Sequence, residues 1–152
     1  MNTERLTGQI ESVLLNTGAD SVAALRSELD TGGRNATRKT TESIKSSVTV
    51  AGSVVTLQVT AANTWPFTDT GRGPGKRPPT AAIREWVVAK GIEPDGTAAD
   101  RAAFLIARAI GEKGAVKRPS FVDPVVLKIK TDLPGLLRRV LLATVPVSVT
   151  KK

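Results

Sequence analysis

Hydrophobic residues recur at helical spacing along the first part of the chain. They lie mostly three or four positions apart, at Leu6, Ile10, Val13, Leu14, Val22, Leu25 and Leu29. This spacing predicts an amphipathic helix over residues 3–31. Gly18 interrupts the helix at a cost of about 1 kcal/mol relative to Ala, so we expect a bend or a close contact there. Gly32 and Gly33 are expected to end the helix.

The polarity pattern changes to strict alternation between Ser47 and Ala61. Valine and leucine alternate with threonine and glutamine on both sides of Gly52, which predicts a β-hairpin that turns at this glycine. One face is apolar and the other is rich in Thr and Gln, so the sheet should be covered on one face only. The helix over residues 3–31 is the expected cover, and Phe67–Thr70 is expected to add a short edge strand.

Helical periodicity returns in the second half of the chain. Pro79 suits the first turn of a helix in which Ile83, Trp86 and Val87 share one face, and Gly91 suits a Schellman stop. Thr97 is expected to cap the next helix. The positions expected to form the buried face of that helix are Ala103, Phe104, Ala107 and Ile110.

A last helix is predicted from Asp123 onward, because Val125, Val126, Ile129 and Leu133 follow at helical spacing. Pro134–Gly135 should kink or split it. The tail Val145–Val149 then alternates like a strand, and Pro146 restricts that strand to the edge of a sheet.

Basic residues concentrate in three segments between these elements. We expect a flexible basic connector near residues 32–46, with a solvated linker as the alternative, and loops over 71–79 and 114–120. Neither nucleotide motif fits the first loop: a Walker sequence needs Gly at Thr70, and a dinucleotide fingerprint needs Gly at Lys76. The candidate contacts to partners or to other copies of the chain are Arg34, Arg38, Lys39, Phe67, Arg72, Lys76, Arg77, Lys117 and Arg118.

Composition argues against an enzyme. The 152 residues, which we expect to form a single domain over 1–152, contain no His, Cys or Tyr, so the commonest general base and the commonest metal ligands are missing. We therefore expect no catalytic residue, no cofactor and no metal site. The chain carries 22 Lys and Arg against 14 Asp and Glu, a net charge of +8, which suits nucleic acid, an acidic protein face or anionic lipid. The polar N-terminus predicts no signal peptide, and no apolar run predicts a membrane span.

Three motifs follow one another with the spacing of a known family. The residues that carry the match are Pro78, Pro79, Ile83, Trp86, Val87, Lys90, Gly91 and Ile92, then Ala103 to Arg108, Ile110 and Gly114, then Arg118, Pro119, Phe121 and Pro124. This order resembles the tail-completion (head–tail joining, virion morphogenesis) proteins of long-tailed double-stranded DNA bacteriophages. The family often has a Tyr and a Glu-Phe-Gly before the loop, where this chain has Phe67, Asp69 and Gly71.

The resemblance implies an α+β fold, with a small antiparallel sheet, a long N-terminal helix and two to three further helices packed on it. It implies a structural protein of the virion neck or tail, assembled in the host cytoplasm, that forms a ring of copies of itself, commonly six. Such a ring joins the portal, connector or adaptor proteins of the head to the tail tube or terminator proteins and leaves a channel through which DNA can pass. A basic nucleic-acid-binding protein is the alternative function.

Overall fold

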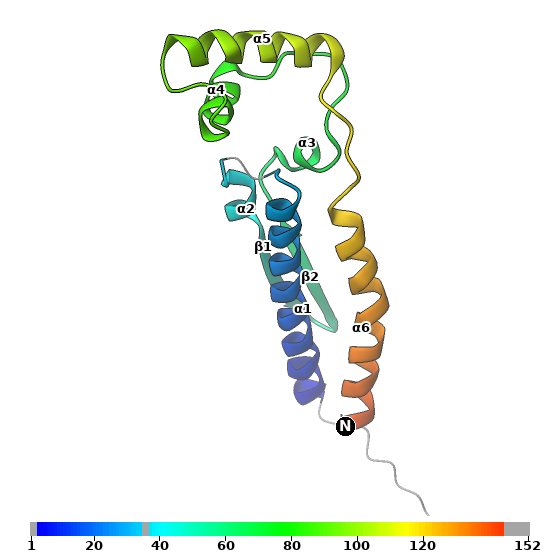
Figure 1. The fold of residues 1–152 in the computed structure, drawn as a ribbon. Helices are drawn as coiled ribbons and strands as arrows, with labels where there is room; N and C mark the ends of the chain where they lie inside the picture. Colours follow the sequence, from blue (N-terminus) through cyan, green and yellow to red (C-terminus); the bar gives the residue numbers. More distant parts are fainter. Residues whose placement is uncertain (1–2, 35–36, 145–152) are drawn as a thin grey trace, which may run out of the picture. The chain divides into compact units, whose positions relative to one another are not determined.

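The computed structural model describes residues 3–34 and 37–144, which form a helix-dominated α+β fold. The predicted fold class, with a long N-terminal helix and a small antiparallel sheet, is confirmed (Figure 1). The elements are α1 (Thr3–Thr31), α2 (Lys39–Ser43), β1 (Lys45–Ala51), β2 (Val54–Thr60), α3 (Trp65–Thr70), α4 (Thr80–Ala89), α5 (Thr97–Lys113) and α6 (Val122–Thr144). The chain gathers into two compact units, which are described in turn.

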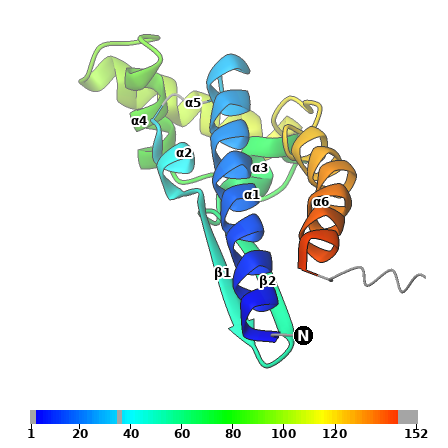
Figure 2. The same ribbon diagram turned by 90° about the horizontal axis from the view of Figure 1, so that it is seen from below.

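The first unit contains the described parts of Met1–Ser27, Ile44–Thr60 and Val122–Lys152. In it α1 lies along the β-hairpin, as Figures 1 and 2 both show, so the expected cover for the apolar face is confirmed. Gly18 marks the close approach, because a Cβ on Gly18 would lie only 2.8 Å from Leu57 Cδ1. The buried apolar side chains of this unit are Leu14, Leu25, Ile44 and Val125.

The hairpin has the predicted alternation and turns at Gly52-Ser53. Strands β1 and β2 pair antiparallel, with Val48 opposite Leu57 and Val50 opposite Val55. Gly52 has a φ of 61°, which a type II′ turn requires at its first central position. The residues of the apolar face are only half-buried along β2, so α1 covers this face incompletely.

Helix α6 runs without a break from Val122 to Thr144, so the expected split at Pro134–Gly135 is wrong. Pro134 removes one helical N–H donor. The half-buried positions continue through it at spacings of three and four, from Ile129 to Leu133 and Leu137. The same face of the helix therefore stays half-buried on both sides of the proline.

The second unit contains the described parts of Glu28–Ser43 and Ala61–Phe121. Its buried apolar side chains are Leu29 of α1, Val87 of α4, the α5 residues Ala99, Ala103 and Ala107, and Phe121. The predicted Schellman stop is confirmed at the end of α4, where Gly91 donates to Val88 and Ile92 donates to Val87.

The expected edge strand at Phe67–Thr70 is wrong, because this segment belongs to helix α3. Pro66 occupies the first turn, where its missing N–H costs nothing. The Thr68 and Thr70 hydroxyls bond to carbonyls four residues earlier. Backbone hydrogen bonds from the Thr68 N–H to Thr64 and from the Gly71 N–H to Phe67 complete this short helix, in a segment expected to be a strand.

Two expectations for α4 and α5 are also corrected. Gly96, not Thr97, is the N-cap of α5, and no side chain caps this end. Phe104, expected on the buried face of α5, is 53% exposed, and Trp86 of α4 is 37% exposed. The alanines of α5 bring the two helices close together and leave the large rings outside.

The predicted tail strand Val145–Val149 lies outside the described residues. Among the helices of the described part, none combines the length and the apolar character that crossing a membrane requires.

Candidate partner-binding interface

The two predicted basic loops lie side by side in the second unit. Three backbone hydrogen bonds join the segment from Thr70 to Gly75 with the segment from Gly111 to Arg118. The Ala115 N–H donates to the Arg72 carbonyl at 2.8 Å, the Gly75 N–H donates to the Gly111 carbonyl at 2.9 Å, and the Arg118 N–H donates to the Thr70 carbonyl at 3.4 Å. We call residues 70–79 and 113–120 the paired loops.

Two glycines allow the paired loops to approach. Gly71 and Gly114 have φ values of 83° and 79° with ψ near 180°, a region of backbone conformation that is essentially restricted to glycine. A Cβ on Gly71 would lie 2.5 Å from the Val116 carbonyl oxygen, and one on Gly114 would lie 2.5 Å from that of Arg72. Each loop therefore leaves room for the backbone of the other.

The pairing concentrates positive charge. The paired loops contain no Asp or Glu, and their cations are Arg72, Lys76, Arg77, Lys113, Lys117 and Arg118. Glu112 borders them: a hydrogen bond from Arg108 is the main cause that lowers the pKa of Glu112, and the charges of Arg77 and Lys113 lower it further. The surface is therefore suited to an anionic partner.

Phe67 belongs to the same surface. The residue is 55% exposed, and the Arg72 guanidinium carbon lies 5.1 Å from the centroid of its ring, within the range of a cation–π contact. The guanidinium also donates to the Lys76 carbonyl at 2.5 Å. These two contacts hold Arg72 against Phe67 and give the basic surface an aromatic edge.

Arg34 lies in the same unit but serves as an internal connection. Its guanidinium donates to the Asp69 carbonyl at 2.7 Å and to the Pro119 carbonyl at 2.8 Å. It also lies 5.3 Å from the centroid of the Phe121 ring. Arg34 thus joins the basic connector to α3 and to the second of the paired loops.

Asp69 is a residue whose role the sequence analysis did not recognise. Its carboxylate accepts the Phe121 N–H at 2.8 Å and the Ser120 hydroxyl at 2.9 Å. Phe121 in turn packs edge-on against Trp65, with ring centroids 5.1 Å apart. The sequence offered no signal for these partners, because they follow Asp69 by more than fifty residues.

Arg38 and Lys39 lie elsewhere in this unit, at the start of α2. Lys39 forms an ion pair with Glu85 of α4, and Arg38 has a φ of 56°, unusual for a residue with a side chain. The structure thus brings Phe67, Arg72, Lys76, Arg77, Lys117 and Arg118 into one surface. Arg34 supports that surface, while Lys39 connects α2 to α4.

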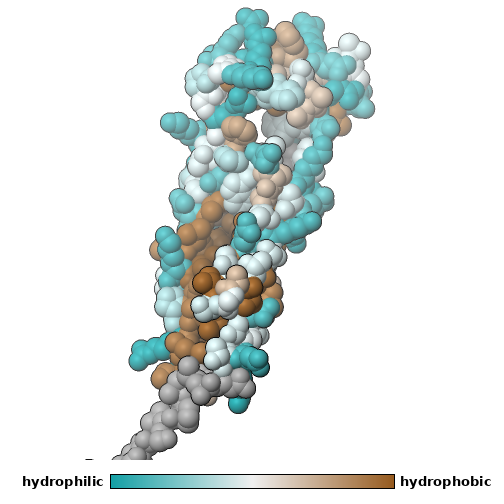
Figure 3. Space-filling model, turned by 180° about the vertical axis from the view of Figure 1, so that it is seen from behind, coloured by the Kyte–Doolittle hydropathy of each residue, from teal (hydrophilic) through white to brown (hydrophobic). Residues whose placement is uncertain are grey.

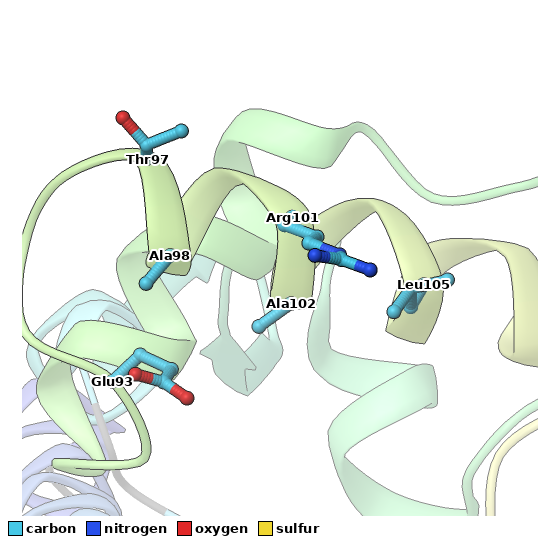
Figure 4. Close-up of a pocket in the computed structure, with 6 residues that line it drawn as sticks. All are labelled: Glu93, Thr97, Ala98, Arg101, Ala102 and Leu105. Atoms are coloured by element: carbon cyan, nitrogen blue, oxygen red, sulfur yellow. The ribbon is translucent and has the colours of Figure 1, made fainter.

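A shallow hollow at the start of α5 offers a second place for contact (Figure 4). Its lining consists of Glu93, Thr97, Ala98, Arg101, Ala102 and Leu105. In Figure 4, Arg101 and Leu105 extend from successive turns of α5, and Glu93 lies below Ala98 and Ala102. The hollow combines one carboxylate and one guanidinium with small and apolar groups.

The first unit exposes apolar side chains of its own. Figure 3 shows hydrophobic side chains gathered in the lower part of the view, over the first unit. Leu127 and Leu142 of α6 are 66% and 63% exposed, and Val54 of the hairpin is 60% exposed. Helix α6 is therefore apolar on more of its surface than the half-buried stripe alone.

Comparison with protein-family models, curated proteins and solved structures found no match to the chain.

Proposed function

We propose that this protein is a structural component of the neck or tail of a long-tailed bacteriophage, where copies of it form a ring between the head connector and the tail tube. The sequence motifs between residues 65 and 124 supply the family resemblance behind this proposal. An α+β fold with a long first helix is the architecture that the resemblance implies.

The main support for a role in assembly is the exposure of large hydrophobic side chains in both units. Leu15, Val54, Phe67, Phe104, Leu105, Val116, Leu127 and Leu142 each have half or more of their surface exposed. Monomeric proteins rarely leave extended apolar surface open to water, and such surface commonly marks a protein interface. Association with other copies and with neighbouring virion proteins would bury these side chains.

The paired loops are the proposed contact to an adjoining virion protein or to DNA in the channel. Their cations attract an acidic surface, and the Phe67 ring adds apolar area. The surface is built on backbone hydrogen bonds between loops. Charge removal should therefore weaken docking without unfolding the protein.

The mass of the purified protein, measured by native mass spectrometry, tests self-assembly. We expect a closed oligomer, commonly of six copies, and rings in electron micrographs. A monomer at all concentrations that can be reached would contradict the assembly role.

Particle assembly tests the paired loops. The variant Arg72→Ala/Lys76→Ala/Arg77→Ala should fold and yet fail to support the joining of heads to tails. A matched control, Arg5→Ala/Arg138→Ala/Arg139→Ala, removes three cations from α1 and α6 of the first unit. Normal particles from the loop variant would show that the paired loops are not a virion contact.

A basic nucleic-acid-binding protein is the second candidate, favoured by six cations without an acid in the paired loops. If the loops bind DNA directly, affinity should fall steeply with salt, with a slope of log K against log salt of about −0.9 for each phosphate neutralised. A gel shift at low salt that shows no binding would dismiss this candidate.

A further inference from the structure

We propose that the paired loops bind the phosphate groups of duplex DNA without regard to base sequence, and that each loop contributes two cations. The inference rests on the proposed function, in which DNA passes through the ring, and it identifies that DNA as the partner of the paired loops. Three features of the molecule support it: four exposed cations that have no partner among the described residues, a backbone that joins the two loops, and the kinds of residue that surround these cations.

Four cations of the paired loops are exposed: Lys76 and Arg77 of the first loop, and Lys117 and Arg118 of the second. Among the residues that the structure describes, no hydrogen bond or ion pair joins the side chain of any of them to another group. The charge of Arg77 acts on Glu112, but that carboxylate is bound to Arg108. Lys113 lies in the last turn of α5, where the negative end of the helix dipole offsets its charge. The four exposed cations are therefore available to an anion from outside.

Other cations of the same unit have partners within it. Lys39, Arg84 and Arg108 form ion pairs with carboxylates, and Arg34 and Arg72 donate to backbone carbonyls. Arg72 therefore shapes the first loop and is not one of the four contacts. The unpaired positive charge gathers on the paired loops, where like charges repel one another until an anion binds.

Three backbone hydrogen bonds hold the cations of the two loops on one frame. They join the loops antiparallel: the partners of Thr70 to Gly75, taken in order, run from Arg118 back to Gly111. A frame fixed in this way loses less conformational freedom on binding than a flexible basic arm would. Duplex DNA carries one negative charge for about every 1.7 Å of its axis, so the phosphates of one duplex can neutralise cations from both loops at once.

The residue types favour a phosphate backbone over an acidic protein face. Two of the four cations are lysines, and lysine is depleted at protein–protein interfaces. Lysine and arginine are, in contrast, the usual charged donors to DNA phosphates. Glycine and proline make up six of the nine residues from 71 to 79, so few side chains stand between the backbone of the first loop and a phosphate.

The same loops have little with which to recognise bases. Residues 70–79 and 113–120 contain no Asn, Gln, Asp or Glu, the side chains that recognise the edges of adenine and cytosine. They contain no aromatic residue on which the bases of a single strand would stack. The Phe67 ring lies beside them, but the Arg72 guanidinium is over its face. The paired loops therefore suit the phosphates of a duplex of any sequence.

Fluorescence anisotropy of a labelled DNA duplex, titrated with the full chain at several salt concentrations, tests the inference. Four neutralised phosphates give a slope of log K against log salt of about −3.6, which corresponds to an affinity loss of about 150-fold between about 50 and 200 mM salt. The variants Lys76→Gln/Arg77→Gln and Lys117→Gln/Arg118→Gln should each halve the slope to about −1.8, an affinity loss of about 12-fold over the same range. Both variants should unfold at the same temperature as the unaltered chain, because no internal partner is removed.

The control is Lys39→Gln/Arg108→Gln, which removes the same charge from the same unit at two ion pairs. Its slope should equal that of the unaltered chain. No binding of the duplex at low salt would overturn the inference, as would an unchanged slope in either loop variant or an equal loss in the control. Tighter binding of poly-glutamate than of the duplex would also overturn it and identify an acidic protein as the partner.

The mass of the same protein, measured by native mass spectrometry, separates this inference from the proposed function. A monomer that binds the duplex with the expected slope supports the contact to DNA and contradicts the ring. Rings that bind no duplex support the structural role and contradict the contact to DNA.

Discussion

Gly18 of α1 faces Leu57 of β2 so closely that no side chain fits between them. A Cβ at position 18 would lie 2.8 Å from Leu57 Cδ1 and 3.0 Å from Ser46 Cβ and Oγ. Each of these distances is shorter than an ordinary carbon contact. The glycine therefore lets the long helix approach the apolar face of the hairpin, and this contact determines how well that face is covered.

The first prediction compares Gly18→Val with Gly8→Val in the same helix. Both changes alter helix propensity equally, but a Cβ on Gly8 would meet nothing within 4 Å. Overpacking at Gly18 should destabilise the protein by about 1–3 kcal/mol, whereas Gly8→Val should change stability by less than about 0.5 kcal/mol. Urea unfolding measures both. Equal stabilities would show that α1 does not pack on the hairpin at Gly18.

The second prediction concerns the guanidinium of Arg34. Its two hydrogen bonds reach carbonyls of α3 and of the second loop, a geometry that the planar guanidinium suits and a single ammonium does not. Arg34→Lys should therefore cost about 1.5–3 kcal/mol in the free energy of unfolding.

The matched control is Arg38→Lys, the same chemical change at an exposed position of the connector. It should change the unfolding free energy by less than about 0.5 kcal/mol. Thermal unfolding of the two variants separates them. A loss of stability that is the same for both would mean that Arg34 acts through its charge and not through its two carbonyl partners.

The long helix and the hairpin could be predicted from the sequence because both depend on a side-chain spacing that repeats along the chain. The stripe from Leu6 to Leu29 predicted α1, and the Val/Thr alternation on each side of Gly52 predicted the hairpin. The end of α4 was also predictable, because a glycine that can adopt a positive φ, followed by Ile92, is the local sequence signal of a Schellman motif. In each case the physical cause lies within a few residues of the signal.

The two errors in secondary structure and burial have different causes, one in tertiary packing and one in local structure. Phe104 is as apolar as any core residue, and only the small alanines of α5 show that the helices pack too closely to enclose a ring. The segment with Phe67 is short and carries no clear periodicity, and Pro66 suits the first turn of a helix as well as it suits an extended segment.

The candidate interface was predictable by composition but not by geometry. The cations of both loops are visible in the sequence, whereas their pairing depends on contacts between residues about forty positions apart, such as Arg72 and Ala115. Asp69 was missed for the same reason, because its partners Ser120 and Phe121 follow it by more than fifty residues. A single sequence carries no direct record of such distances.

The third prediction tests the glycines that allow the loops to pair. Gly71→Ala and Gly114→Ala each place a Cβ about 2.5 Å from a carbonyl oxygen of the opposite loop, at a backbone conformation suited only to glycine. Each change should destabilise the protein by about 2–4 kcal/mol, since the strain and the clash add. Gly73→Ala is the control: its Cβ would meet nothing within 4 Å, so stability should stay the same or rise by about 0.4–1 kcal/mol. The N–H groups of Ala115 and Gly75 join the two loops. If the loops separate, amide hydrogen exchange at these two groups should become faster. Protection that survives in Gly71→Ala and Gly114→Ala would show that the loops do not depend on the glycines to remain paired.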